Sequence, residues 1–348
     1  MIWLTWRQFR GSAATMAALL VLLAAALALT GPGLAADYSA GIAACAQDNT
    51  CDRFYDHFFD GHDTSFMALS LAVLLLPALA GLFWGAPLIT RELEAGTHLL
   101  VWNQSITRAH WLAVKLGLMG LTAIALAGLC GLMVTWWADP LDRSAVENLA
   151  LMAPLVFGAR GIAPMGYAAF AFVLGVSVGM LVRRTLPAMV LTLAVFAALQ
   201  LAMPLLVRPH LMPPITATFE LGRTNVDRIS IPRDGGANPR ISLGLAVPGQ
   251  AGAWVLANDL LDPSGRVISD GGEGAVVAIS ATSGPCAPTA GGGDGCIVEI
   301  NRLGYRQQAT YQPLERFWPF QWIETGIYAL LTLGLTWLSF WWIRRRLT

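Results

Sequence analysis

The chain has 348 residues, of which 55% are hydrophobic and only 13% are charged, and its formal net charge is zero. An ordinary soluble domain carries roughly 25% charged residues, so this composition excludes a typical soluble protein, in agreement with a mean hydropathy of +0.57. Because the net charge is zero, no overall field favours binding to nucleic acid.

The first ten residues predict a short interfacial helix. Trp3, Trp6 and Phe9 recur at helical spacing in Met1–Arg10, and tryptophan favours the boundary between membrane and water. A cleaved signal peptide is the alternative, because residues 31–36 (GPGLAA) resemble a cleavage region.

Six apolar stretches are long enough to cross a membrane, which takes roughly 20 residues. Backbone groups in lipid must be paired within the segment, so each stretch predicts a helix. The sequence therefore predicts a polytopic α-helical membrane protein with spans at Gly11–Ala36, Phe66–Thr90, Leu116–Ala138 (its helix starting near Leu112), Gly161–Val182, Thr185–Val207 and Thr325–Ile343.

Basic residues set the expected orientation. With six spans, four basic clusters fall on one side of the membrane, and such clusters favour the cytoplasm. We therefore expect a multi-pass protein of the bacterial cell membrane with both termini cytoplasmic. The clusters are Arg7 and Arg10; Arg91, Arg108 and Lys115; Arg183 and Arg184; and Arg344, Arg345 and Arg346. Lys115 is expected to reach from span three to the lipid headgroups.

Two pairs of cysteines fall in predicted outer loops, where disulfides persist. Cys45 and Cys51 share the first loop, and Cys286 and Cys296 share the last, whereas Cys130 lies inside a span. The spacing predicts the disulfides Cys45–Cys51 and Cys286–Cys296, with free thiols or pairing between the loops as alternatives.

Between spans three and five, Asn148–Val182 predicts one long segment. It is either a helix that projects from the membrane or a half-helix followed by a full span. Arg160 would lie near the outer interface, where we expect it to pair with headgroups rather than to act in function.

Arg208–Arg316 differs from the rest of the chain. Turn-forming motifs such as RDGGANPR and GGGDG separate short β-branched runs, which predicts strands joined by turns. We expect a β-rich extracytoplasmic domain between helices 5 and 6, followed by the last span and a basic tail in 317–348. The expected strands are Ile241–Val247, Trp254–Leu260, Val267–Ser269, Ala275–Ala281 and Ile297–Ile300.

Catalytic and cofactor motifs are absent from the sequence. It contains no GxxxxGK[ST], HExxH or CxxC pattern, and no GxSxG motif at the strand-to-helix turn of a nucleophile elbow. His57 and His62 lie among aspartates, but their spacing matches no metal motif. No pair of ionisable residues is expected in the middle of a span, as a proton-coupled pump usually needs. We therefore predict no catalytic, cofactor or metal site in this chain.

The stretch Pro87–Lys115 concentrates charge between two spans. It predicts a helix, a break at Gly96 and Thr97, and a second helix that returns to the bilayer. We expect this helix–turn–helix to lie on the cytoplasmic side.

Three segments together resemble the membrane subunits of ABC-2 type exporters, in the branch typical of high-GC Gram-positive bacteria. They are WLTWRQFR (3–10), RELEAGTHLLVWNQSITRAHWLAVKLG (91–117) and RFWPFQWIETG (316–326). The β-rich insert departs from this family, many members of which carry short re-entrant helices at that place.

The resemblance implies a dimer of permease chains, more often a homodimer, paired with two ABC ATP-binding subunits that hold ATP and magnesium. The chain itself would be non-catalytic and would move a drug, peptide or lipid outward. The elbow and coupling helix of the family would place its ATPase contact at Arg91, Glu92, Glu94, Gly96 and Thr97. The alternatives are a membrane sensor or anchor whose outer domain binds a ligand, and a membrane-embedded enzyme.

Overall fold

The computed structural model describes residues 2–48, 51–96, 107–144, 149–230, 238–250, 252–268, 274–280, 283–287 and 293–345. Within these ranges, six helical segments are long and apolar enough to cross a membrane. The predicted six-span helical membrane protein is therefore confirmed. The six segments are Ala13–Ala46, Asp63–Glu94, Arg108–Ser144, Ala163–Val182, Thr185–Leu211 and Leu314–Arg345.

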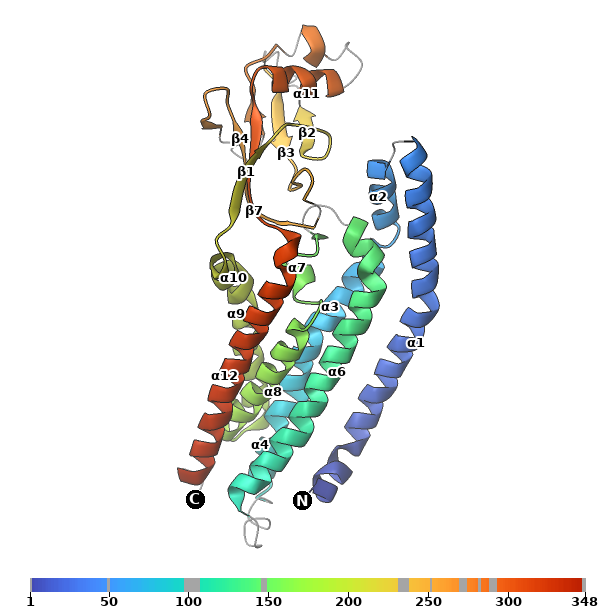
Figure 1. Ribbon diagram of the computed structural model, residues 1–348. Coiled ribbons are helices and arrows are strands. Elements are labelled where there is room, and N and C mark those ends of the chain that lie inside the picture. Colours follow the sequence, from blue (N-terminus) through green and yellow to red (C-terminus); the bar gives the residue numbers. More distant parts are fainter. Residues whose placement is uncertain are drawn as a thin grey trace.

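The spans run up and down, so that both termini lie at one end of the bundle and the strands at the other (Figure 1). We name these the terminal end and the sheet end. In chain order the helical elements are α1 (Ile2–Asp48), α2 (Cys51–Asp60), α3 (Asp63–Leu79), the π-helical turn η1 (Ala80–Gly85), α4 (Ala86–Glu94), α6 (Arg108–Ser144), α7 (Pro154–Phe157), α8 (Ala163–Val182), α9 (Thr185–Ala202), the π-helical turn η3 (Met203–Val207), α10 (Arg208–Leu211), η4 (Gly284–Cys286), α11 (Gly293–Arg302), η6 (Leu314–Arg316) and α12 (Phe317–Arg345).

The first helix differs from its prediction at both ends. α1 runs unbroken for 47 residues, or about 70 Å, so the expected interfacial helix Met1–Arg10 is not a separate element. At the sheet end, α1 continues through the expected loop to Asp48, and α2 packs back against it. Phe54 and Phe58 of α2 contact Tyr38 of α1, with ring centroids 6.2 and 5.5 Å away. This aromatic contact explains how a polar, acidic stretch becomes helical.

The segment before α8 is broken. α7 is a single turn, and Gly161 with φ +62° separates it from α8. Of the two alternatives for Asn148–Val182, the continuous helix is therefore wrong. The side-chain oxygen of Gln321 accepts hydrogen bonds from the backbone N–H groups of Ile162 and Ala163, at 3.1 and 2.8 Å. This contact fixes the start of α8.

α8 lies at the centre of the bundle and contacts α3, η1, α4, α6, α9 and α12. Glycine makes the closest of these approaches. A Cβ at Gly85 would lie 2.4 Å from the carbonyl oxygen of Phe172, and a Cβ at Gly175 would lie 2.4 Å from that of Gly81. Small residues allow membrane helices to come this close. The backbone of η1 therefore packs directly on that of α8.

Two antiparallel sheets form most of the domain that follows α10. One has the order β1-β7-β4-β5 and the other β2-β3-β6. The β-rich composition is confirmed, but Ile297–Ile300 lies in helix α11 rather than in a strand. The strands are β1 (Ile215–Phe219), β2 (Val226–Ser230), β3 (Arg240–Leu243), β4 (Trp254–Leu261), β5 (Val267–Ile268), β6 (Ala275–Val276) and β7 (Arg306–Gln312).

Both predicted disulfides are formed. Cys45–Cys51 joins the end of α1 to α2, and Cys286–Cys296 joins η4 to α11. Cys130 is free and buried. An apolar cluster that includes Met152, Phe157, Trp254 and Phe320 then joins the sheets to the bundle.

Candidate functional site

The predicted coupling residues lie where the second span ends. α3, η1 and α4 form one continuous segment, Asp63–Glu94. Pro87 lies inside this segment, directly after the π-helical turn η1, and does not begin a separate helix. Arg91, Glu92 and Glu94 are in the last turn of this spanning segment rather than on a separate elbow helix.

Gly96 ends the helix. Its φ is +67°, a left-handed conformation that glycine adopts without strain at a helix C-terminus. The N–H of Gly96 donates to the carbonyl oxygen of Leu93 at 3.3 Å. The predicted break at this point is confirmed for Gly96, whereas Thr97 lies outside the described residues, as do 98–106.

Glu94 contacts the start of α9. One carboxylate oxygen accepts a hydrogen bond from the backbone N–H of Thr185, and the other accepts one from the Thr185 hydroxyl, both at 2.8 Å. The buried Thr90 hydroxyl lies 2.9 Å from the same Thr185 hydroxyl. Glu94 therefore satisfies a backbone donor at the N-terminus of α9, which a helix leaves unpaired, and a carboxylate is favoured there by the helix dipole.

Glu92 points to a different helix. It forms an ion pair and hydrogen bond with Lys115 of α6. The Lys115 side chain is only 6% exposed, and its ammonium group lies 4.6 Å from the centre of the Trp111 ring. The expected extension of Lys115 to the headgroups is therefore wrong: the lysine is buried because a carboxylate and an aromatic face replace water.

The two carboxylates thus tie the end of α4 to its neighbours, Glu92 to α6 and Glu94 to α9. Arg91, on the same turn, is exposed. The turn between α8 and α9 adds Arg183 and Arg184, which are both exposed. The terminal end therefore presents cations outward, while its carboxylates are engaged between helices.

Sequence reasoning did not find Thr185 or Thr90. Thr185 directly follows the Arg183-Arg184 turn, at the first position of α9. A hydroxyl residue at the start of a helix is a capping signal, but no local pattern connects it with Glu94, 91 residues earlier.

Buried ion pairs lie toward the sheet end. Arg208 makes two hydrogen bonds to the Glu324 carboxylate, at 2.9 and 3.0 Å, and both side chains are almost fully buried. The Tyr167 hydroxyl donates to the same carboxylate at 2.5 Å, and the Arg208 guanidinium lies 4.1 Å from the centre of the Phe157 ring. This pair lies toward the sheet end rather than in the middle of the spans, because Arg208 is three residues from the end of the span Thr185–Leu211.

A second buried pair corrects the expectation for Arg160. Its guanidinium donates two hydrogen bonds to Asp142 of α6, at 3.0 and 3.3 Å, and a third to Ser70 of α3 at 3.2 Å. The Arg160 side chain is fully buried, so it pairs with protein rather than with headgroups.

His57 and His62 lie in α2 and directly before α3. Across the ranges that the structure describes, no three His, Cys, Asp or Glu side chains gather as they would around a metal ion. One ring nitrogen of His62 lies 3.0 Å from the carbonyl oxygen of Phe58, and His57 is exposed.

Comparison with known proteins gives one family match. The family model described as ABC-2 membrane transporter related matches residues 17–208, more than half of the chain. No curated protein matches significantly. No solved structure does so either. The matched range covers α4, α6 and α9, the helices joined through Glu92 and Glu94. The chain therefore belongs to the ABC-2 membrane transporter related family.

Proposed function

We propose that the chain is the permease subunit of an ATP-driven ABC exporter. The family match supports a membrane subunit that associates with an ABC ATP-binding subunit. The chain contains no phosphate-binding GxxxxGK[ST] loop, so ATP and magnesium would be bound by that partner. We further propose two permease chains, as a homodimer, with two ATP-binding subunits, both chain termini being cytoplasmic.

The proposal rests on the side-chain contacts that join the terminal end of α4 to two other spanning helices. Glu92 joins α4 to α6, and Glu94 joins it to α9. A displacement of the α4 end would therefore move three spanning helices together. In this proposal the contact with the ATP-binding subunit is made by exposed Arg91 and by Gly96 and Thr97, while Glu92 and Glu94 position the helices behind it.

The mechanism requires two states of the permease. ATP closes the dimer of ATP-binding subunits, and this closure favours one arrangement of the linked helices over the other. A nucleotide shifts such an equilibrium only as far as it stabilises one state more than the other. The cargo is proposed to be amphipathic, a drug, peptide or lipid, because the outward faces of the spans are apolar. Exposed examples are Leu19 and Leu22 of α1 and Leu330 and Leu333 of α12.

The test is co-purification in mild detergent with each candidate ABC ATPase of the same genome, followed by ATP hydrolysis measurements. We expect Arg91→Glu and Gly96→Pro to weaken the complex. Arg228→Glu, which makes the same charge reversal on β2 at the sheet end, should leave it intact. If no ATPase associates, or if Arg91→Glu and Arg228→Glu behave alike, the coupling assignment fails. A ligand-binding sensor would then be the function to test.

A further inference from the structure

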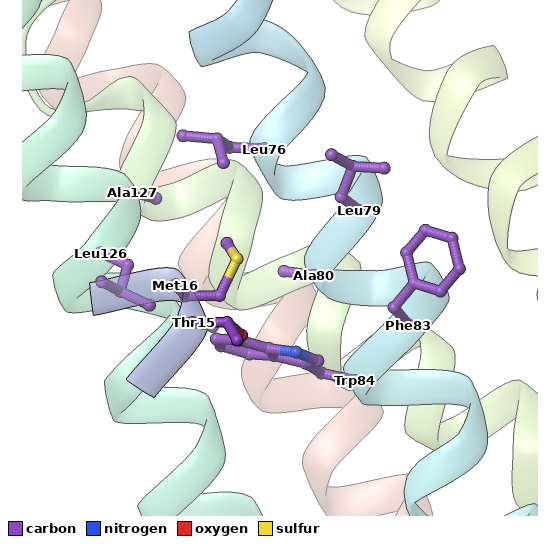
Figure 2. Close-up of a pocket in the computed structure, with 10 residues that line it drawn as sticks. Thr15, Met16, Leu76, Leu79, Ala80, Phe83, Trp84, Leu126 and Ala127 are labelled. Atoms are coloured by element: carbon purple, nitrogen blue, oxygen red, sulfur yellow. The ribbon is translucent and has the colours of Figure 1, made fainter. Parts of the chain in front are cut away.

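An apolar cavity of about 250 Å³ lies between α1, the α3–η1 segment and α6 (Figure 2). Thr15 and Met16 of α1 form one wall, Leu76 and Trp84 the second, and Leu126 and Ala127 of α6 the third. The cavity lies within three membrane-spanning segments, so hydrocarbon rather than water surrounds the protein at this depth.

The packing of η1 explains why space remains here. On one side of this turn, Gly81 and Gly85 lie directly against the backbone of α8. The other side presents Ala80 and Trp84 to the cavity, opposite the small residues Ala123 and Ala127 of α6. Because η1 is held against α8 and the residues that face it on α6 are small, α1 closes the space only partly.

Each of the three helices carries a cation on the terminal side of the cavity. Arg10 precedes Thr15 by five residues, Arg91 follows Trp84 by seven, and Lys115 precedes Ala123 by eight. At 1.5 Å per helical residue, these cations lie roughly 8–12 Å along the helices from the cavity. Arg10 and Arg91 are exposed, whereas Lys115 is paired with Glu92.

The apolar cavity and the nearby cation match the acyl chain and the anionic headgroup of one lipid. An apolar cavity of about 150 Å³ holds a benzene molecule, so 250 Å³ leaves room for a longer piece of hydrocarbon. Basic sites between transmembrane helices bind anionic lipid headgroups. We propose that the cavity binds one acyl chain of an anionic glycerophospholipid of the surrounding bilayer, with its phosphate at Arg10. This lipid stays bound to the permease and is distinct from the transported cargo.

The test is photolabelling of the full-length protein in lipid nanodiscs. The probe is phosphatidylglycerol with a diazirine in its acyl chain, and labelled residues are located by mass spectrometry. We expect labels concentrated at Met16 and Trp84. Ala127→Leu, and independently Met16→Trp from the opposite wall, should fill the cavity and lower labelling of Trp84 at least fivefold. Leu121→Trp is the control, because Leu121 is 68% exposed on the same helix.

The headgroup part of the proposal is tested separately. Arg10→Gln should lower the preference for the phosphatidylglycerol probe over a phosphatidylcholine probe about fivefold, the effect of one basic residue near an anionic lipid surface. Labels spread evenly over exposed residues such as Leu19 and Leu22 would overturn the proposal, as would equal labelling by the two probes. It would also be overturned if the filling variants blocked cargo export without changing lipid labelling.

Discussion

At the scale of single residues, the carboxylates of α4 act inside the permease. Glu94 is exposed, yet both of its oxygens accept hydrogen bonds from Thr185. An exposed carboxylate near a subunit surface can bind a partner or fix its own chain, and these contacts favour the second role. The resemblance to ABC-2 exporters assigned Glu94 to the ATPase contact. The geometry instead favours a positioning role for it.

A double-mutant cycle separates the two roles of Glu94. If Glu94 acts through Thr185, then Glu94→Gln and Thr185→Val weaken the same link, because the first replaces one acceptor oxygen by an amide nitrogen and the second removes the hydroxyl donor. Their effects on cargo-stimulated ATP hydrolysis should then be less than additive. Co-purification with the ATPase should remain intact in all three variants. Additive losses, or loss of the complex with Glu94→Gln alone, would assign Glu94 to the ATPase contact instead.

The buried pair Arg208–Glu324 gives a second prediction. Removing one partner leaves the other charge buried and unpaired, which costs about 3–5 kcal/mol. Arg208→Met should therefore lower the thermal unfolding temperature strongly. Adding Glu324→Gln should recover part of the loss, because the double variant leaves no unpaired charge. A single variant as stable as the wild-type chain, or a double variant that loses the sum of both effects, would contradict the pairing.

At the scale of elements, the contact between η1 and α8 depends on glycine. Gly85→Ala would place a Cβ 2.4 Å from the carbonyl oxygen of Phe172, and a backbone atom in a packed helix cannot easily move away. Overpacking of this kind costs about 1–3 kcal/mol. We expect a lower unfolding temperature in detergent for Gly85→Ala and Gly175→Ala. Gly117→Ala is the matched control, because a Cβ at that position would have nothing within 4 Å of it. Equal effects at Gly85 and Gly117 would show that the close approach is not needed.

The sequence predicted the spans well because membrane crossing depends on local composition. It failed where a distant contact decides the structure. The polar end of α1 is helical because α2 packs against it through Phe54 and Phe58. Strand β7 (RQQATYQ) was not predicted because few of its residues are apolar, and its pairing with β1 and β4 determines its conformation.

The candidate site was predicted in position but not in detail. Local charge located the α4 turn, and Gly96 marked its end. The partners of Glu92 and Glu94 lie 23 and 91 residues away in the chain. No local pattern contains that information. The same reason explains why the partners of Arg160 and Arg208 were not predicted.

At the scale of the whole molecule, α8 contacts more of the other spanning segments than its neighbours do and reaches both ends of the bundle. It is the most buried of the six spans, with 78% of its apolar window inside the protein. Near its start, Tyr167 contacts Glu324 and thereby the Arg208 pair. At its other end, it leads through the Arg183-Arg184 turn to Thr185 and Glu94. If α8 moves as a rigid body, a displacement at the terminal end also displaces Tyr167 and its contacts at the sheet end.

Coupling through α8 requires that the membrane separate the terminal end from the sheet end. Two independent features predict the orientation of these ends. Cations gather at the terminal end, and such clusters favour the cytoplasm. They are Arg10, Arg91, Arg183, Arg184, Arg344 and Arg345. The two disulfides lie at the sheet end, and disulfides persist in oxidising compartments. Both features favour a sheet end outside the cell.

Cysteine labelling in intact cells checks this orientation. In a Cys130→Ser background, which removes the free thiol, Ser264→Cys places an exposed thiol in the turn after β4, and Thr107→Cys places one just before α6. A membrane-impermeant maleimide should label Ser264→Cys in intact cells but Thr107→Cys only after permeabilisation. The reverse pattern would invert the topology and move the proposed ATPase contact out of the cytoplasm. Labelling of both thiols in intact cells would mean that the bundle does not separate the two ends, and the coupling through α8 would lose its basis.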